Sequence, residues 1–127
     1  MPTIAYRVQA DDGRGPWRPG WSHTWIDADA PPDRLTETVM DLVPVSVLRS
    51  LPDEMMYGSA CRTYDALMHW FTASERQKLA AAGYHPVRLQ VDVVLAESDW
   101  QLLIGRRRPF WDGATRLRWP AKISSKV

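Results

Sequence analysis

The 127-residue chain has little cysteine, little phenylalanine and no long apolar run. Cys61 is the single cysteine, so an intramolecular disulfide is impossible and a disulfide-stapled fold is excluded. No apolar stretch approaches the roughly 18 residues that a membrane-spanning helix needs, and the N-terminus lacks the basic and apolar regions of a secretory signal. A free thiol also suits a reducing compartment. We therefore expect a cytoplasmic protein that has no membrane partner.

The chain also has almost no net charge, with 16 basic and 15 acidic side chains. This balance removes the simplest argument for a protein that binds polyanions. The charges are unevenly distributed, however, because residues 106–127 carry seven bases and one acid, whereas residues 1–105 carry nine bases and fourteen acids. We predict one domain over 1–105 and a basic C-terminal extension over 106–127, which either folds back onto the acidic body or contacts an anionic partner such as nucleic acid.

The apolar pattern predicts an α+β fold, with a small antiparallel or mixed sheet and helices packed on one face. Strict alternation over residues 3–9 predicts the first strand, with Ile4, Tyr6 and Val8 on one side. Residues 55–60 are expected to form or approach a second strand. A strand over 87–93 and a last strand over 100–105 are expected to pair as an antiparallel hairpin, with a turn between them.

Helix signals lie between these predicted strands. A helix is expected to begin at Pro31 and to end before Pro44, because proline is tolerated in the first turn and not in the interior. Thr63 is a candidate N-cap for a second helix. Residues 72–75 match a capping box, with a threonine followed three residues later by a glutamate, and Gly83 is suited to end that helix.

Tryptophan is abundant instead of phenylalanine, with seven copies against two. Three of the seven lie in the sequence PWRPGWSHTW, whose prolines and glycine oppose a helix, so a long Trp-rich loop is expected after the first strand. Trp and Arg are enriched in interface hot spots, although a domain with little phenylalanine also needs tryptophan in its core. The candidate binding residues of this loop are Trp17, Arg18, Trp21, His23 and Trp25.

The sequence RRRPFW that follows the last predicted strand combines guanidinium groups with aromatic rings. This composition is typical of a site that grips single-stranded nucleic acid or phosphate. Arg106, Arg107 and Arg108 are therefore candidate binding residues, and a solvated strand end is the alternative.

No complete catalytic or metal-binding set is present in the sequence. The three histidines and Cys61 lack the close spacing of a zinc site, so no metal is expected. Gly13-Arg14-Gly15 follows a strand, as a dinucleotide fingerprint does, but the prolines after it prevent a helix from opening there. Cys61 and His69 are conceivable as a nucleophile and its base, but a small buried cysteine is the more common case.

The order of these features resembles that of small phage and prophage proteins. Tyr6-Arg7 stand near the start, the GPWRPGWSHTW loop follows, and a helix-Gly-strand-Gln-strand unit ends the match over about residues 5–105. Small phage accessory proteins, anti-CRISPR proteins among them, often bind and disable a host machine. The resemblance thus implies a non-enzymatic protein without a cofactor that inhibits a host protein or ribonucleoprotein complex in the host cell.

A second resemblance, in segment order, is to the ADP-ribosyltransferase core. That family has an Arg or His on its first strand, a Ser or Tyr near its second, and a Glu or Gln late in the domain. The resemblance implies NAD as the substrate, with an arginine that holds its phosphates and a late acid that polarises the ribose. The family's Ser-Thr-Ser sequence is absent here, and Glu97 falls in a predicted turn. The matching positions are Arg7, Ser59 or Tyr64, and Glu97 or Gln101.

Overall fold

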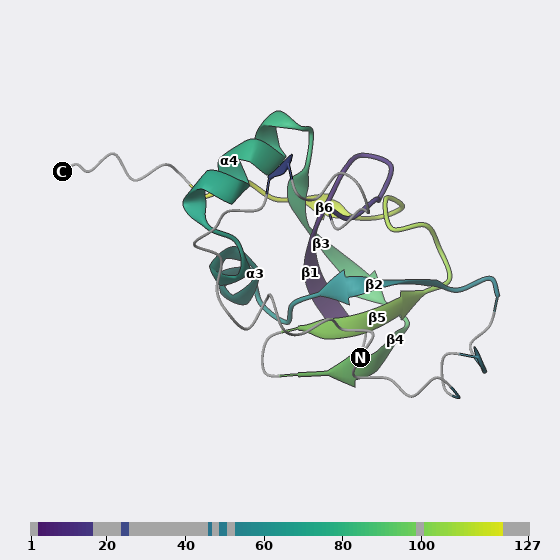
Figure 1. The fold of residues 1–127 in the computed structure, drawn as a ribbon. Helices are drawn as coiled ribbons and strands as arrows, with labels where there is room; N and C mark the ends of the chain where they lie inside the picture. Colours follow the sequence, from purple (N-terminus) through teal and green to yellow (C-terminus); the bar gives the residue numbers. More distant parts are fainter. Residues whose placement is uncertain are drawn as a thin grey trace.

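The computed structural model describes residues 3–16, 24–25, 46, 49–50, 53–98 and 101–120. Within these residues the fold is α+β, as expected, with two helices and two three-stranded sheets (Figure 1). The strands therefore form two small sheets rather than one, and every strand pair in them is antiparallel. The helix predicted to begin at Pro31 and most of the Trp-rich loop lie outside the described residues.

The first sheet has the strand order β1-β3-β6. It consists of β1 (Thr3–Gln9), β3 (His85–Val91) and the short β6 (Thr115–Arg116). The prediction of a first strand over 3–9 is confirmed. Arg7 and Gln9 are both buried even though they alternate with the apolar side chains of β1, because this strand is covered on both faces.

The second sheet has the order β2-β5-β4 and consists of β2 (Met56–Ala60), β5 (Leu102–Arg106) and β4 (Val93–Glu97). The predicted second strand is confirmed by β2. The predicted hairpin between 87–93 and 100–105 is wrong, because β5 pairs with β4 and β2, whereas β3 belongs to the other sheet.

Asp92 is the physical reason for this difference. It stands alone between the ends of β3 and β4, is exposed, and adopts a bend that carries the chain from one sheet to the other. Its carboxylate accepts the backbone N–H of Arg107 at 2.7 Å, and its own N–H donates to the carbonyl of Gly105 at 3.0 Å. One continuous apolar alternation in the sequence is thus divided between two sheets.

The two sheets meet along β1 and β2. Tyr6 and Cys61 form an isolated antiparallel bridge, with N–H to O distances of 2.9 Å and 2.7 Å. The strands therefore follow one another in space from β4 through β5 and β2 to β1, β3 and β6.

Helices α3 (Tyr64–Trp70) and α4 (Ala73–Ala81) lie on the same side of the molecule in Figure 1. The predicted caps are confirmed, since Thr63 accepts from the backbone of α3 and the capping box at 72–75 opens α4. Gly83 follows the C-cap of α4 with φ +90, the left-handed conformation that favours glycine. Among the described residues, no helix has the length and apolar character needed to cross a membrane.

Among the described residues, two main apolar clusters form the interior. The helix-side core lies between the helices and β1, and the inter-sheet core gathers side chains from both sheets. The helix-side core contains Val8, Trp25, Cys61, Leu67, Met68, Trp70, Phe71, Leu79 and Tyr84. The inter-sheet core contains Ala5, Ala60, Val87, Leu89, Val91, Leu102, Ile104 and Phe110.

Candidate functional site

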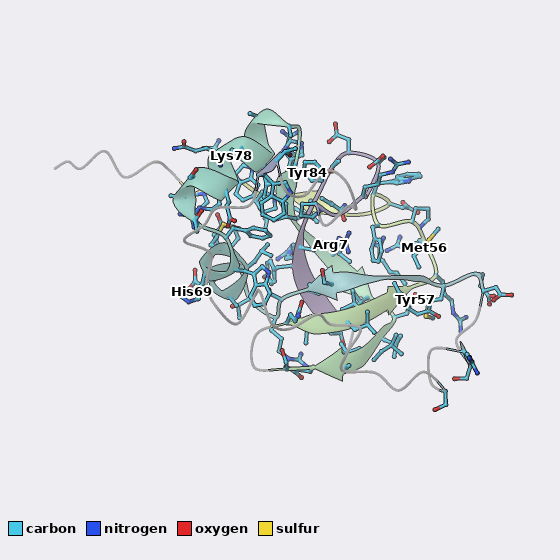
Figure 2. The ribbon with its side chains drawn as sticks, viewed as in Figure 1. Arg7, Met56, Tyr57, His69, Lys78 and Tyr84 are labelled. Atoms are coloured by element: carbon cyan, nitrogen blue, oxygen red, sulfur yellow. The ribbon has the colours of Figure 1, made fainter. Side chains whose placement is uncertain are left out.

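Arg7 is a buried cation on β1, and Figure 2 shows it well inside the outline of the fold. Only 6% of the residue is exposed, and burial lowers the pKa of its guanidinium to about 10. The group is therefore still charged at neutral pH. No carboxylate pairs with it in the part of the chain that the structure describes. Burial of a charge without an opposite partner costs free energy, so a buried arginine of this kind is a candidate functional residue.

Backbone carbonyls and one aromatic ring hold the guanidinium. Nη1 donates to the carbonyl of Ser59 at 3.3 Å, and Nη2 donates to the carbonyl of Gly13 at 3.2 Å. The Cζ atom lies 4.2 Å from the centre of the Phe110 ring, a cation–π contact. Nε has no hydrogen-bond partner within the described residues. These contacts fix the group, and no described residue supplies a counterion for its charge.

Two glycines make room for this arrangement. A Cβ at Gly58 would overlap the Arg7 guanidinium, and a Cβ at Gly15 would lie 3.2 Å from Nη2. The β2 backbone can therefore approach the arginine this closely because Gly58 lacks a side chain, and a side chain at Gly15 would crowd the guanidinium.

A pocket of about 30 Å³ lies beside Arg7, and we call it the Arg7 pocket. Its polar lining comes from three parts of the chain: Arg7 on β1, Ser59 on β2 and Gln101 directly before β5. Its other described lining residues are Val8, Gly15, Pro16, Ala60, Cys61, Leu67, Trp70 and Phe71. The pocket thus combines one fixed positive charge, a serine and an amide with an apolar wall.

The two remaining candidates from the ADP-ribosyltransferase resemblance lie elsewhere. Tyr64 begins α3, and its hydroxyl donates to the carbonyl of Arg118 at 2.6 Å. Glu97 ends β4 on the surface and forms a two-pronged ion pair with Arg62, which holds the pKa of that carboxyl below its usual range. Of the two candidates from the late part of the domain, Gln101 and not Glu97 therefore lies at the Arg7 pocket. The described lining of the pocket includes no carboxylate.

Cys61 is 3% exposed, and burial raises the pKa of its thiol to about 12. A thiol of this kind is protonated at neutral pH and is a poor nucleophile. His69 lies on the outer side of α3, exposed to solvent (Figure 2). In the described part of the chain, no three His, Cys, Asp or Glu side chains gather closely enough to hold a metal ion.

The residues predicted to bind a partner are distributed differently. Trp25 is buried in the helix-side core, where its Nε1 donates to the carbonyl of Pro16 at 3.1 Å. Arg106 is 1% exposed and donates from Nε to the carbonyl of Gln90 at 2.7 Å, so it serves the packing of β5. Arg107 and Arg108 are exposed. The other predicted positions, which lie outside the described residues, are Trp17, Arg18, Trp21 and His23.

Sequence reasoning missed Phe110 and Gln9 as parts of this region. Phe110 reaches back from the segment after β5 to the Arg7 guanidinium, and its carbonyl accepts from Gln9 Nε2 at 2.9 Å. One pattern in the sequence could have indicated Gln9: it shares a face of the first strand with Arg7, because the two residues are two positions apart. The contact with Phe110 itself joins residues far apart in the chain and has no local signal.

Comparisons of the chain with protein-family models, with curated proteins and with solved structures found no match. Its function is therefore inferred from the residues and geometry of the Arg7 pocket.

Proposed function

We propose that the Arg7 pocket binds NAD and that the protein is an NAD-using relative of the ADP-ribosyltransferases. One observation carries the proposal: Arg7, Ser59 and Gln101, which come from three separate parts of the chain, line the same pocket. They are the residue types that the resemblance names for the first strand, the second strand and the late part of the domain.

Arg7 suits the phosphates of NAD. Its bonds to the carbonyls of Ser59 and Gly13 orient the guanidinium but do not neutralise it. Arginine binds phosphate through charge-assisted hydrogen bonds in a planar fork, and a positive charge with low solvent exposure is screened weakly. An anionic group at the pocket would supply the counterion that the described residues do not provide.

The pocket volume limits how much of the dinucleotide enters. About 30 Å³ is room for roughly one or two water molecules. The pocket therefore admits one small polar group of NAD, such as a phosphate oxygen or the nicotinamide carboxamide, while the rest lies outside it. Ser59 and Gln101 offer a hydroxyl and an amide that can hydrogen-bond to this group or to the ribose.

The amide of Gln101 also sets an expectation for the chemistry. In ADP-ribosyl transfer, the bond between nicotinamide and ribose C1′ breaks, nicotinamide leaves with the bonding electrons, and an acceptor attacks C1′. A carboxylate stabilises the positive charge that develops on the ribose. An amide hydrogen-bonds to the ribose without carrying a negative charge, so we expect NAD binding with slow transfer.

Calorimetric titration with NAD tests the proposal. We expect wild-type protein to bind NAD, and Gln101→Ala and Arg7→Met to raise the Kd about tenfold or more, because each removes a polar contact. Glu97→Gln is the matched control and leaves the Kd unchanged, since that residue is paired with Arg62 on the surface. Circular dichroism verifies that each variant is folded. Absence of NAD binding by folded wild-type protein refutes the proposal.

The prediction of a phage-type protein that inhibits a host protein or ribonucleoprotein complex is a separate candidate. The exposed Arg107 and Arg108 favour contact with some partner, while Trp17 and Trp21 lie outside the described residues. Replacing Trp17 and Trp21 with alanine and measuring capture of host components tests it. Unchanged capture by a folded double variant would remove this candidate.

A further inference from the structure

A second pocket, of about 100 Å³, lies at the end of the first sheet, and we call it the Trp111 pocket. Its described lining residues are Gln9, Ala10, Asp11, His85, Val87, Trp111, Ala114 and Arg116. None of them lines the Arg7 pocket. The chemistry proposed for NAD therefore leaves this second pocket without a role.

Strand register explains why these side chains converge. Gln9 on β1 is paired with His85 on β3, and Val87 on β3 is paired with Arg116 on β6. Side chains of directly paired residues in antiparallel strands lie on the same face. His85 and Val87 are two residues apart in one strand, so all four belong to one face at the end of the sheet.

Trp111 forms one wall and is 55% exposed, although it is a large apolar side chain. The residue before it is anchored, because Phe110 is buried in the inter-sheet core and its carbonyl accepts from Gln9. The turn after β1 packs closely here, since a Cβ at Gly13 would lie 3.2 Å from the backbone nitrogen of Trp111, and Gly13 has φ +89. The indole is therefore attached to fixed backbone, which lowers the entropy cost of stacking a ligand on it.

The polar groups of the pocket supply charge and hydrogen-bonding capacity. Arg116 is an exposed cation on β6. His85 Nε2 lies 3.3 Å from the Asp11 carboxylate, so a donor and an acceptor stand side by side on another wall. Gln9 Nε2 donates to the carbonyl of Phe110, and the Oε1 atom of Gln9 is buried and has no donor among the described residues.

We propose that the Trp111 pocket binds a nucleotide, with the base stacked on the Trp111 ring and the phosphate at Arg116. A flat nucleobase with N–H groups can stack on the exposed Trp111 ring, next to the carboxylate of Asp11, which can accept a hydrogen bond from the base. A phosphate matches the exposed guanidinium of Arg116. A free nucleotide and a residue of a single-stranded nucleic acid share this chemistry.

Titration of the full chain with separate probes tests the proposal. The probes are the ribonucleoside monophosphates, single-stranded DNA and RNA oligonucleotides of about eight nucleotides, and inorganic phosphate. We expect Trp111→Ala and Arg116→Ala each to raise the Kd for a nucleotide probe about tenfold. Arg118→Ala and Met56→Ala are the controls, because both side chains are exposed and neither lines the pocket, and they leave the Kd unchanged.

The outcomes separate the sources of the ligand. Tighter binding of an oligonucleotide than of any monophosphate assigns the pocket to a single strand, and equal or tighter binding of a monophosphate assigns it to a free nucleotide. Because none of the described lining residues is shared by the two pockets, failure of NAD binding at the Arg7 pocket leaves this result intact. The proposal is overturned if wild-type protein binds no nucleotide probe, if inorganic phosphate binds as tightly as a nucleotide, or if neither pocket substitution weakens binding.

Discussion

The Arg7 pocket and the Trp111 pocket differ in how much of the fold depends on their residues. The segment after β5 contributes to both regions, since Phe110 contacts the Arg7 guanidinium and Trp111 forms a wall of the Trp111 pocket. At Arg7 the charged group is enclosed and is held by backbone carbonyls from two parts of the chain. At Trp111 the ring and the nearby cation are exposed. Substitutions of Arg7 are therefore expected to lower both the stability of the fold and ligand binding. Substitutions of Trp111 are expected to weaken ligand binding with little effect on stability.

The largest effect expected from this comparison is a contrast between two adjacent residues. Phe110→Ala removes a buried ring from the inter-sheet core and from beneath the guanidinium, so we expect it to lower the free energy of unfolding by about 3–5 kcal/mol. Trp111→Ala removes a side chain that is mostly exposed, and we expect a loss within about 0.5 kcal/mol. Urea unfolding followed by circular dichroism measures both. Equal losses for the two variants would contradict the contrast between the pockets.

A smaller effect is expected at Gly58. A methyl group there overlaps the Arg7 guanidinium, so Gly58→Ala should lower the free energy of unfolding by about 1–3 kcal/mol. Part of this loss should disappear in the Arg7→Ala background, because the overlapping group is then absent. A double-mutant cycle of unfolding free energies measures this coupling. Strict additivity of the two substitutions would show that the overlap does not involve Arg7.

The smallest effect concerns the pH dependence contributed by Cys61. Burial raises the pKa of its thiol from 9.0 to about 12, so the unfolded chain releases a proton at a lower pH than the folded chain does. The contribution of Cys61 to stability is complete below pH 9 and is lost as the pH rises from about 9 to 12. The difference in unfolding free energy between wild-type protein and Cys61→Ala, measured at pH 8 and pH 10, should shrink at the higher pH.

Thiol labelling provides an independent measurement of the same burial. At pH 8.5 the folded protein should react with a disulfide reagent far more slowly than the protein in denaturing urea. Labelling of native protein at the rate of the unfolded chain would show that Cys61 is accessible, contrary to its burial in the helix-side core.

Local sequence signals predicted the local parts of the fold. The capping box at 72–75 and the glycine at 83 are satisfied by contacts within a few residues, so α4 begins and ends as expected. The strand over 3–9 was predicted by alternation alone. The hairpin prediction failed because the alternation of apolar and polar residues does not show where a chain passes from one sheet to another. The bend at Asp92, where this happens, is stabilised by the backbone of Arg107, which is distant in the sequence.

The candidate site was predictable only as a set of residue types. Arg7, Ser59 and Gln101 were named from their order along the chain, but whether they meet depends on the pairing of β2 with β5 and on the bridge between Tyr6 and Cys61. The exclusion of Glu97 depends on the surface pair with Arg62, which no local pattern contains. Arg106 illustrates the same point, since an RRR sequence gives no indication that one guanidinium is enclosed.

The single residue that links β3 to β4 restricts how this molecule can deform. Asp92 is the only residue between β3 and β4, so the two sheets are joined there by a linker of one residue. The Tyr6–Cys61 bridge joins the sheets a second time, between β1 and the end of β2. Two attachments on different strands prevent the sheets from swinging apart as independent bodies. The chain between β5 and β6 crosses from one sheet to the other over residues 107–114 and carries both Phe110 and Trp111. Because both residues lie on this one segment, a displacement of it would alter the Phe110 contact with the Arg7 guanidinium and the wall of the Trp111 pocket together, while both sheets keep their strand pairing.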